Sequence, residues 1–237
     1  MQKMLSQLRR CIDEYKMIDE GDRIIVGASG GKDSTALLYL MAHLQKFYPK
    51  KFELFAVSLD MGFGADYSPL TELCEKIGVT HIIRKTDIKQ VVFDIRKESN
   101  PCSLCAKMRR GALNDAVLEL GAKKVALGHH EDDAIETFFL SLFYEGRINC
   151  FSPCTFLDRT GVMQIRPMLY LSERQVINFS QRENLPTVYN PCPANKKTKR
   201  EDTKQLIKEL EGRYPDLKKH VFGAIQRLPI TGWGRDL

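Results

Sequence analysis

Four short apolar runs in the first part of the chain are each followed by a segment whose apolar residues recur at helical spacing. Runs of this kind are typical of buried parallel strands, and a helix after each one indicates βαβ units. The pattern predicts a doubly wound α/β fold with right-handed crossovers and a ligand at the carboxyl ends of the strands. The expected strands cover residues 23–27, 53–59, 80–84 and 124–128.

The remaining segments are expected to be helices, loops or irregular chain. Residues 99–102 break the helical pattern and are expected to form a loop, and residues 147–168 are expected to be irregular. Because neither a linker nor a repeat is visible, we interpret residues 1–237 as one domain, with a core over about 20–170 and a C-terminal cysteine loop and helices over about 171–237. The expected helices cover residues 2–17, 34–47, 69–77, 89–97, 106–120, 131–144, 172–183 and 201–228.

Composition narrows the class of protein. The sequence contains no run of about 18 apolar residues, so a membrane span is not expected, and its first segment lacks the apolar stretch of a signal peptide. We therefore expect a cytoplasmic protein. Seven cysteines in a reducing compartment favour metal binding or catalysis over disulfides. The formal charge of +6 permits a polyanionic partner such as RNA.

The first chemical motif, Ser29-Gly30-Gly31-Lys32-Asp33-Ser34, joins the first expected strand to the next helix. Its two glycines carry no Cβ atoms, so the backbone can turn tightly and present N–H groups to an anion. The following helix directs its positive N-terminal end into the same space, and Lys32 adds a cation. The motif matches neither GxxxxGK[ST] nor GxGxxG. The alternative is a glycine-rich turn without a ligand, but the strand–turn–helix context favours a phosphate site.

This motif resembles the one that defines the PP-loop ATP pyrophosphatase superfamily. Members of that superfamily adenylate a carbonyl oxygen and release pyrophosphate, with Mg²⁺ balancing the phosphate charge. The resemblance implies that all six residues of the motif bind ATP.

A second motif, GHHEDDAIET, begins at Gly128 after the fourth expected strand. In the superfamily an element of this type lies beside the nucleotide, so Gly128 and His129 are nucleotide candidates. Asp132 or Asp133 can hold Mg²⁺ through water. Acidic residues also favour a helix N-terminus without any ligand, and one acid can serve each purpose. Asp60, at the end of the second expected strand, is either a further nucleotide contact or an ordinary turn residue.

Cys102 and Cys105 form a C-x2-C pair, which is typical of zinc, an iron–sulfur cluster or a redox dithiol. A thioredoxin-like pair would follow the first strand of its unit, whereas this pair follows the third expected strand. A zinc site needs a second pair, and Cys150 and Cys154 offer only C-x3-C. Cys192 supplies a third thiol in a proline-flanked loop. A cubane cluster on three thiolates leaves one iron open for a sulfur atom.

The ordered set SGGKDS, CSLC with a following RRGAL, GHHEDDAIET and a downstream Pro-Cys resembles the TtcA family of tRNA 2-thiocytidine synthetases over about residues 20–200. The resemblance implies a [4Fe-4S] cluster on Cys102, Cys105 and Cys192. It also implies ATP-dependent replacement of the 2-oxo group of an anticodon-loop cytidine by sulfur, which makes the chain a sulfurtransferase. The candidate catalytic residues are these three cysteines with Asp132 and Asp133. The second cysteine of the family's PC-x2-C element is missing here, where Asn195 stands, but three thiolates suffice for the cluster.

Basic residues follow both cysteine elements. A run of charges is as often a solvated face as a binding surface, and Arg109 and Arg110 can equally serve ATP phosphates. Because Lys and Arg position a nucleic acid through its phosphates, and an anticodon loop can offer an unstacked base, we interpret this set as RNA-binding. The set comprises Lys107, Arg109, Arg110, Lys196, Lys197, Lys199 and Arg200.

The expected reaction has two steps. The cytidine O2 attacks the α-phosphate of ATP, giving an adenylated base, and sulfide then attacks C2 while AMP leaves. The expected cofactors are a [4Fe-4S] cluster, ATP and Mg²⁺. The expected partners are tRNA and a cysteine desulfurase or another sulfide donor, with no membrane and with a homodimer as one assembly that the sequence allows.

Three alternatives stay open. One is thiolation of uridine, as in the related TtuA enzymes, although those carry cysteine-rich zinc elements at both ends and the N-terminus here has only Cys11. Another is an iron–sulfur or zinc RNA-binding module that senses nucleotide without turnover. The third is a PP-loop enzyme that amidates or reduces a small molecule. Lysidine synthetases share the ATP motifs but have no need of three cluster cysteines.

Overall fold

The computed structural model describes residues 1–96, 101–189, 191–192 and 199–228. Its chain divides into two compact units. Unit 1 consists of Met1–His130 and Pro153–Lys196, and unit 2 consists of Glu131–Ser152 and Lys197–Leu237. This division does not test whether the units fold separately, so one domain over residues 1–237 stays a prediction.

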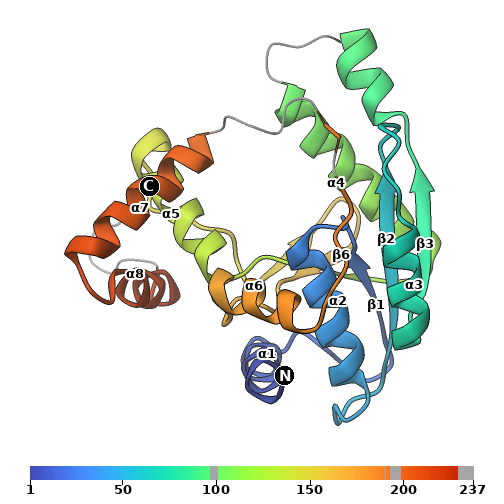
Figure 1. Cartoon of the computed structure of the whole chain (residues 1–237), viewed down its shortest axis with the longest axis horizontal. Coiled ribbons are helices and arrows are strands. Elements are labelled where there is room, and N and C mark those ends of the chain that lie inside the picture. The colour runs from blue at the N-terminus through green and yellow to red at the C-terminus, as the bar shows by residue number, and fades with distance from the viewer. Residues whose placement is uncertain (97–100, 190, 193–198, 229–237) are drawn as a thin grey trace. The chain divides into compact units, whose positions relative to one another are not determined.

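The centre of unit 1 is a six-stranded sheet in the order β3-β2-β1-β4-β6-β5, of which Figure 1 labels β3, β2, β1 and β6. All neighbouring strands are parallel except β5, which is antiparallel to β6 at one edge. The α/β fold with a mostly parallel sheet is therefore confirmed. The strands are β1 (Asp22–Gly27), β2 (Phe52–Asp60), β3 (Thr80–Lys85), β4 (Lys124–Ala126), β5 (Cys154–Leu157) and β6 (Val162–Ile165).

Helices cover both faces of this sheet. Helix α4 (Pro101–Glu119) buries Ala116 and Val117 against a cluster that includes Ile25 of β1. Ile24 and Val26 are also fully buried, and because successive strand residues point to opposite faces they lie on the other side. There α2 (Lys32–Gln45) packs on β1 and β2. The further helices that pack on α2 are α1 (Gln2–Glu14), α3 (Ser68–Ile77) and α6 (Glu173–Arg182).

The carboxyl ends of β1 and β4 lie side by side at the point where the strand order reverses. Val26 pairs with Ala126 across these two strands, while the connection after β1 leads towards β2 and β3 on one side of the sheet. In open α/β sheets a ligand binds in the crevice outside such a switch point. The fold therefore brings the loop after β1 and the residues after β4 to the same edge.

One expectation about the sheet was wrong. Residues 147–168 were expected to be irregular, yet they contain the hairpin of β5 and β6, and β6 pairs with β4. Each of these strands has only four residues, which is too short to show a period of two. The pairing of β6 with β4 is a tertiary contact that local sequence does not reveal. The available signal was Thr160-Gly161, where Gly161 has a φ of +69° in the turn.

Two helix predictions also need correction. Helix α4 begins at Pro101, so Pro101 and Cys102 are helical rather than part of a loop, while residues 99 and 100 lie outside the described chain. Proline fits the first turn of a helix because its missing N–H has no partner there. The helix expected over residues 89–97 is a π-helix, η1 (Gln90–Arg96).

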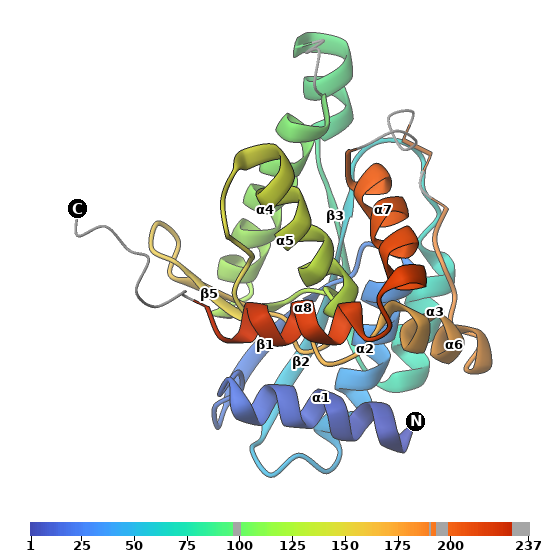
Figure 2. The same ribbon diagram turned by 90° about the vertical axis from the view of Figure 1, so that its left-hand side faces the viewer.

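Unit 2 is helical. Helices α7 (Lys199–Arg213) and α8 (Leu217–Gln226) both pack on α5 (Glu131–Glu145), as Figure 2 shows. Its small core joins Ile135 and Phe139 of α5 to Ile207 of α7. The helical region expected over residues 201–228 is thus two helices. None of the helices in the described parts of either unit is long and apolar enough to cross a membrane.

Candidate nucleotide and thiol site

The loop after β1 leads directly into α2. Ala28 continues the strand, since its N–H donates to the Val57 carbonyl at 2.8 Å. Gly31 is the residue before the helix, and among the described residues no side chain caps it. The first N–H groups of a helix have no partner within the helix. An uncapped helix start behind a glycine turn is therefore well suited to bind phosphate.

Two glycines let separate parts of the chain approach this loop. Gly30 has a φ of +82°, and a Cβ atom there would lie 2.4 Å from the Cβ of Val188. A Cβ on Gly128 would lie 3.0 Å from the backbone of Asp33 and Ser34. Glycine is required at both places for different reasons, a left-handed turn with close packing at Gly30 and close backbone approach at Gly128. The two predicted motifs are thus in contact.

The hydroxyl groups of the loop hold its own backbone. The Ser34 hydroxyl donates to the Gly31 carbonyl at 3.0 Å, and its oxygen lies 3.1 Å from that of Ser29. The Gly31 N–H in turn donates to the Ser29 hydroxyl at 3.4 Å. The two serines therefore preorganise the turn.

The loop also rests on a buried chain of polar groups. The Ser58 hydroxyl, fully buried, donates to the Ala28 carbonyl at 2.5 Å. The Nε2 atom of His81 lies 2.8 Å from that hydroxyl, and its Nδ1 atom lies 2.9 Å from the Thr71 hydroxyl. Burial lowers the pKa of His81.

Lys32 is paired with carboxylates beside the loop. Its Nζ atom lies 2.9 Å from Oδ1 of Asp33 and 3.2 Å from Oε1 of Glu173, the first residue of α6. Burial lowers the pKa of Lys32, but the two carboxylates outweigh burial and raise it overall. The Nε2 atom of His130 lies 3.7 Å from Asp33 Oδ1. His130 and Glu173 were not among the predicted site residues, and only His130 carried a signal, its place in the second motif.

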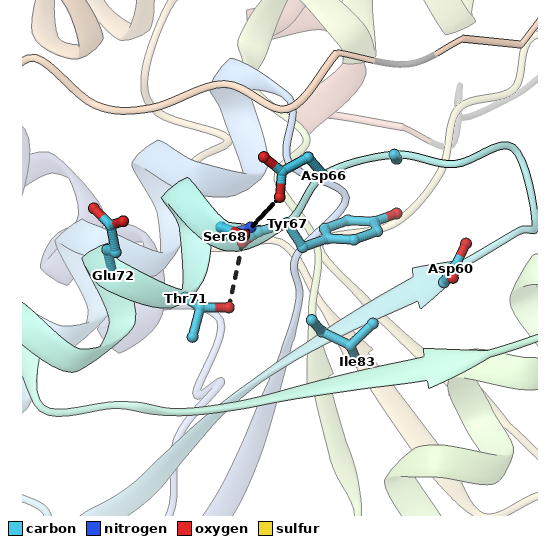
Figure 3. A pocket seen from close by; sticks show the side chains of 8 residues that line it. Asp60, Asp66, Tyr67, Ser68, Thr71, Glu72 and Ile83 are labelled. Carbon is cyan, nitrogen blue, oxygen red and sulfur yellow. Dashed lines mark hydrogen bonds between the residues drawn. The ribbon is translucent and has the colours of Figure 1, made fainter.

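Asp60 lies at the end of β2 and accepts a hydrogen bond from the Gly62 N–H at 2.9 Å. That bond is the one expected of a turn residue, so a nucleotide contact for Asp60 stays a prediction. Asp60 also lines a cavity of about 420 Å³ between β2, β3 and the start of α3 (Figure 3). Tyr67 also lines this cavity, and its hydroxyl donates to the Leu59 carbonyl at 2.9 Å.

Three thiols gather in unit 1. Cys102 is exposed and Cys105 is half-buried, both in the first turns of α4, and Cys192 is half-buried downstream. Burial raises the pKa of Cys105, Arg109 lowers it, and the neighbouring thiols of Cys192 and Cys102 raise it further. The thiols of Cys102 and Cys192 therefore lie within electrostatic range of Cys105. The three thiols do not converge on one point, since no three His, Cys, Asp or Glu side chains of the described residues form a site for a single ion.

The other four cysteines have structural surroundings. Burial raises the pKa of Cys11 to about 12 and that of Cys74 to about 11. The Cys150 thiol donates to the Ala134 carbonyl at 3.4 Å, and the Cys154 thiol donates to the Tyr15 carbonyl at 3.7 Å. Thiols with a raised pKa, such as those of Cys11 and Cys74, are poor nucleophiles at neutral pH.

The acidic residues of the second motif form ion pairs with basic residues of unit 2. Asp132 Oδ1 lies 2.9 Å from the Nζ atom of Lys218 on α8. Arg200 of α7 lies 3.3 Å from Asp133 Oδ1 and 2.8 Å from Glu136 Oε2. Burial raises the pKa of Glu136, although Arg200 opposes this. The sequence carried no signal for the partnership with Lys218.

The basic residues predicted to bind RNA have varied surroundings. Lys107, Arg109 and Arg110 are exposed on α4. Lys199 is exposed, with its Nζ atom 4.6 Å from the centre of the Tyr144 ring, whereas Arg200 is bound to carboxylates. Lys196 and Lys197 lie outside the described residues.

Comparison with known proteins adds a family context. The family model of the PP-loop domain matches residues 2–210. The tRNA-cytidine(32) 2-sulfurtransferase of Bordetella avium is 37% identical over 241 residues, covering 99% of this chain and 76% of the relative. The one from Dichelobacter nodosus is 38% identical over 232 residues, covering 95% of this chain and 87% of the relative.

Among solved structures, the U34-tRNA thiolase NcsA from Methanococcus maripaludis with its [4Fe-4S] cluster superposes with a TM-score of 0.78. The two chains are 23% identical, and the match covers 95% of this chain and 77% of the other. At this identity the likeness establishes the fold alone.

Proposed function

The chain belongs to the PP-loop family of tRNA-cytidine(32) 2-sulfurtransferases, and from this premise we propose that it replaces the 2-oxo group of an anticodon-loop cytidine in tRNA with sulfur at the expense of ATP. The observation that carries the proposal is the uncapped start of α2 behind Gly30 and Gly31, with Gly128 packed against it at the switch point of the sheet. Such a site suits the phosphates of a nucleotide.

The loop residues act on ATP by position and charge. The N–H groups at the start of α2 donate to phosphate oxygens, and Lys32 offsets their negative charge. Ser29 and Ser34 keep the turn in shape before ATP arrives, so less ordering is needed on binding. Gly128 and His129 line the nucleotide, with Asp60 as a further contact. The cytidine O2 then attacks the α-phosphate, the bond to the β-phosphate breaks, and pyrophosphate leaves.

The thiols of Cys102, Cys105 and Cys192 would hold a [4Fe-4S] cluster. The donor set suits such a group, because thiolates are the usual ligands of iron–sulfur clusters, and the other two thiols lie within electrostatic range of Cys105. When bound, the cluster would supply an iron without a protein ligand, which offers a binding position for sulfur from a donor. Sulfide forms a bond to C2 of the adenylated base while the bond from C2 to O2 breaks, and AMP carries that oxygen away.

Asp132 and Asp133 are the proposed catalytic carboxylates. Oxygen ligands suit Mg²⁺, which balances the charge of the phosphates. In the structure these carboxylates are paired with Lys218 and Arg200, so binding a cation requires those ion pairs to rearrange. The pairs hold both carboxylates in fixed positions on α5.

The proposed partners are tRNA and a cysteine desulfurase or another sulfide donor. The exposed Lys107, Arg109 and Arg110, next to the thiols on α4, support an RNA contact through phosphates. We propose the same contact with RNA phosphates for a second set of basic residues, Lys196, Lys197, Lys199 and Arg200. A cytoplasmic location and a homodimer are part of the proposal.

The test is a reaction with anaerobically reconstituted protein, unmodified tRNA, Mg²⁺–ATP and sulfide. We expect tRNA-dependent pyrophosphate release and 2-thiocytidine in the digested RNA. Lys32→Ala should abolish both products, whereas Lys76→Ala, an exposed lysine on α3, should leave both unchanged. A yield of 2-thiouridine instead would favour the uridine enzymes. Nucleotide binding without pyrophosphate would favour a sensing module.

A further inference from the structure

The phosphate loop is attached to the chain segment that leads to Cys192. The Val188 N–H donates to the Gly30 carbonyl at 2.8 Å. Its side chain occupies the place that a Cβ on Gly30 would fill, 2.4 Å from the Val188 Cβ. Val188 therefore holds one peptide of the loop by a hydrogen bond and by packing.

The same segment holds the loop at a second point. Glu173 at the start of α6 lies 3.2 Å from the Lys32 Nζ atom. The start of α6 is fixed by a capping box, in which Ser172 and Gln175 bond to each other's backbone. The chain between residues 173 and 188 thus contacts the phosphate loop at both of its ends.

Cys192 is only four residues beyond Val188. A fully extended chain spans about 3.5 Å per residue, so Cys192 is within about 14 Å of Val188. A shift of Val188 can therefore change the position of the Cys192 thiol through a short segment of chain.

We propose that Val188 is a positioning residue that couples nucleotide in the phosphate loop to the position of Cys192. The coupling rests on the proposed function, in which ATP occupies this loop and Cys192 serves with the other thiols. Arriving phosphates compete with Glu173 for Lys32 and fix the peptide of Gly30. Because the Val188 side chain packs against Gly30, Val188 is fixed as well, and the access of solvent to Cys192 decreases.

The test uses the metal-free full-length protein and an alkylating reagent, with the rate at each cysteine read by mass spectrometry. Addition of a non-hydrolysable ATP analogue with Mg²⁺ should slow alkylation of Cys192 several-fold and leave the rate at Cys102 unchanged. Val188→Gly removes the side-chain contact and should abolish most of this protection. Thr187→Gly, at the adjacent exposed residue, loosens the backbone equally and should keep it.

Calorimetric binding of the analogue to each variant separates the outcomes. If the analogue does not bind the wild type, the ATP site itself is wrong. If it binds but does not change the rate at Cys192, the coupling is wrong while the proposed function stands. If Val188→Gly binds the analogue and keeps full protection, the nucleotide shields Cys192 directly and Val188 has no positioning role.

Discussion

Replacing Gly30 with alanine tests whether the phosphate loop depends on close packing as well as on backbone geometry. A residue with a Cβ at a φ of +82° costs about 1–2 kcal/mol. The new Cβ would also lie 2.4 Å from that of Val188, and relieving such an overlap costs about 1–3 kcal/mol. We expect Gly30→Ala to lower the free energy of unfolding by about 2–5 kcal/mol in urea denaturation, with an unchanged m-value.

Gly21→Ala is the matched control. Gly21 has a φ of +77°, but a Cβ there would meet no atom within 4 Å. It should therefore show only the backbone cost of about 1–2 kcal/mol. In a Val188→Gly background, Gly30→Ala should cost about 1–3 kcal/mol less than in the wild type, because the overlap is gone. Equal effects of Gly30→Ala and Gly21→Ala, with no coupling to Val188, would refute the packing argument.

Three further changes test the surroundings of the loop. Gly128→Ala would push a Cβ to 3.0 Å from the backbone of Asp33, and we expect about tenfold weaker ATP binding by calorimetry, equivalent to about 1.4 kcal/mol; unchanged affinity would contradict the contact between the two motifs. Arg200→Gln removes the ion pair of the largely buried Glu136 with Arg200 and should lower the free energy of unfolding by about 1–3 kcal/mol. Adding Glu136→Gln should restore part of this loss. If the effects of the two substitutions simply add, the two residues are not coupled. Burial lowers the pKa of His81 in the folded protein, so the unfolded chain takes up a proton at a higher pH than the folded protein does. The free energy of unfolding should therefore decline as the pH falls below about 6.5. His81→Gln should remove this decline, and the same decline in that variant would assign it to other groups.

The strands of the parallel sheet could be predicted because they are buried on both faces. Ile24, Ile25 and Val26 are fully buried, and such strands appear in the sequence as continuous apolar runs. The hairpin of β5 and β6 had no such run. Its place in the sheet depends on pairing with β4, which is a contact between distant residues.

In the candidate site, too, the local turn could be predicted from the sequence, whereas the contacts between distant segments could not. The turn at Gly30 and Gly31 could be predicted, since only glycine combines a tight turn with exposed N–H groups. The contacts of Lys32 with Glu173 and of Gly30 with Val188 join segments far apart in sequence. No local pattern encodes them. They became visible only once the fold placed α6 beside the loop.

Only part of the three-thiol group could be predicted from the spacing of the cysteines. The C-x2-C pair was evident, but its link to Cys192 came from family resemblance rather than from spacing. In the structure Cys192 and Cys102 lie within electrostatic range of Cys105 and raise its pKa. The roles of these cysteines as cluster ligands stay predictions.

The central claim is that this chain uses ATP to place sulfur on a cytidine of tRNA. The most direct measurement is nucleoside mass spectrometry of tRNA from cells that lack the gene, with and without a plasmid copy. The account predicts that 2-thiocytidine disappears, returns with the wild-type copy and does not return with Lys32→Ala. Undiminished 2-thiocytidine in the deleted cells would contradict it.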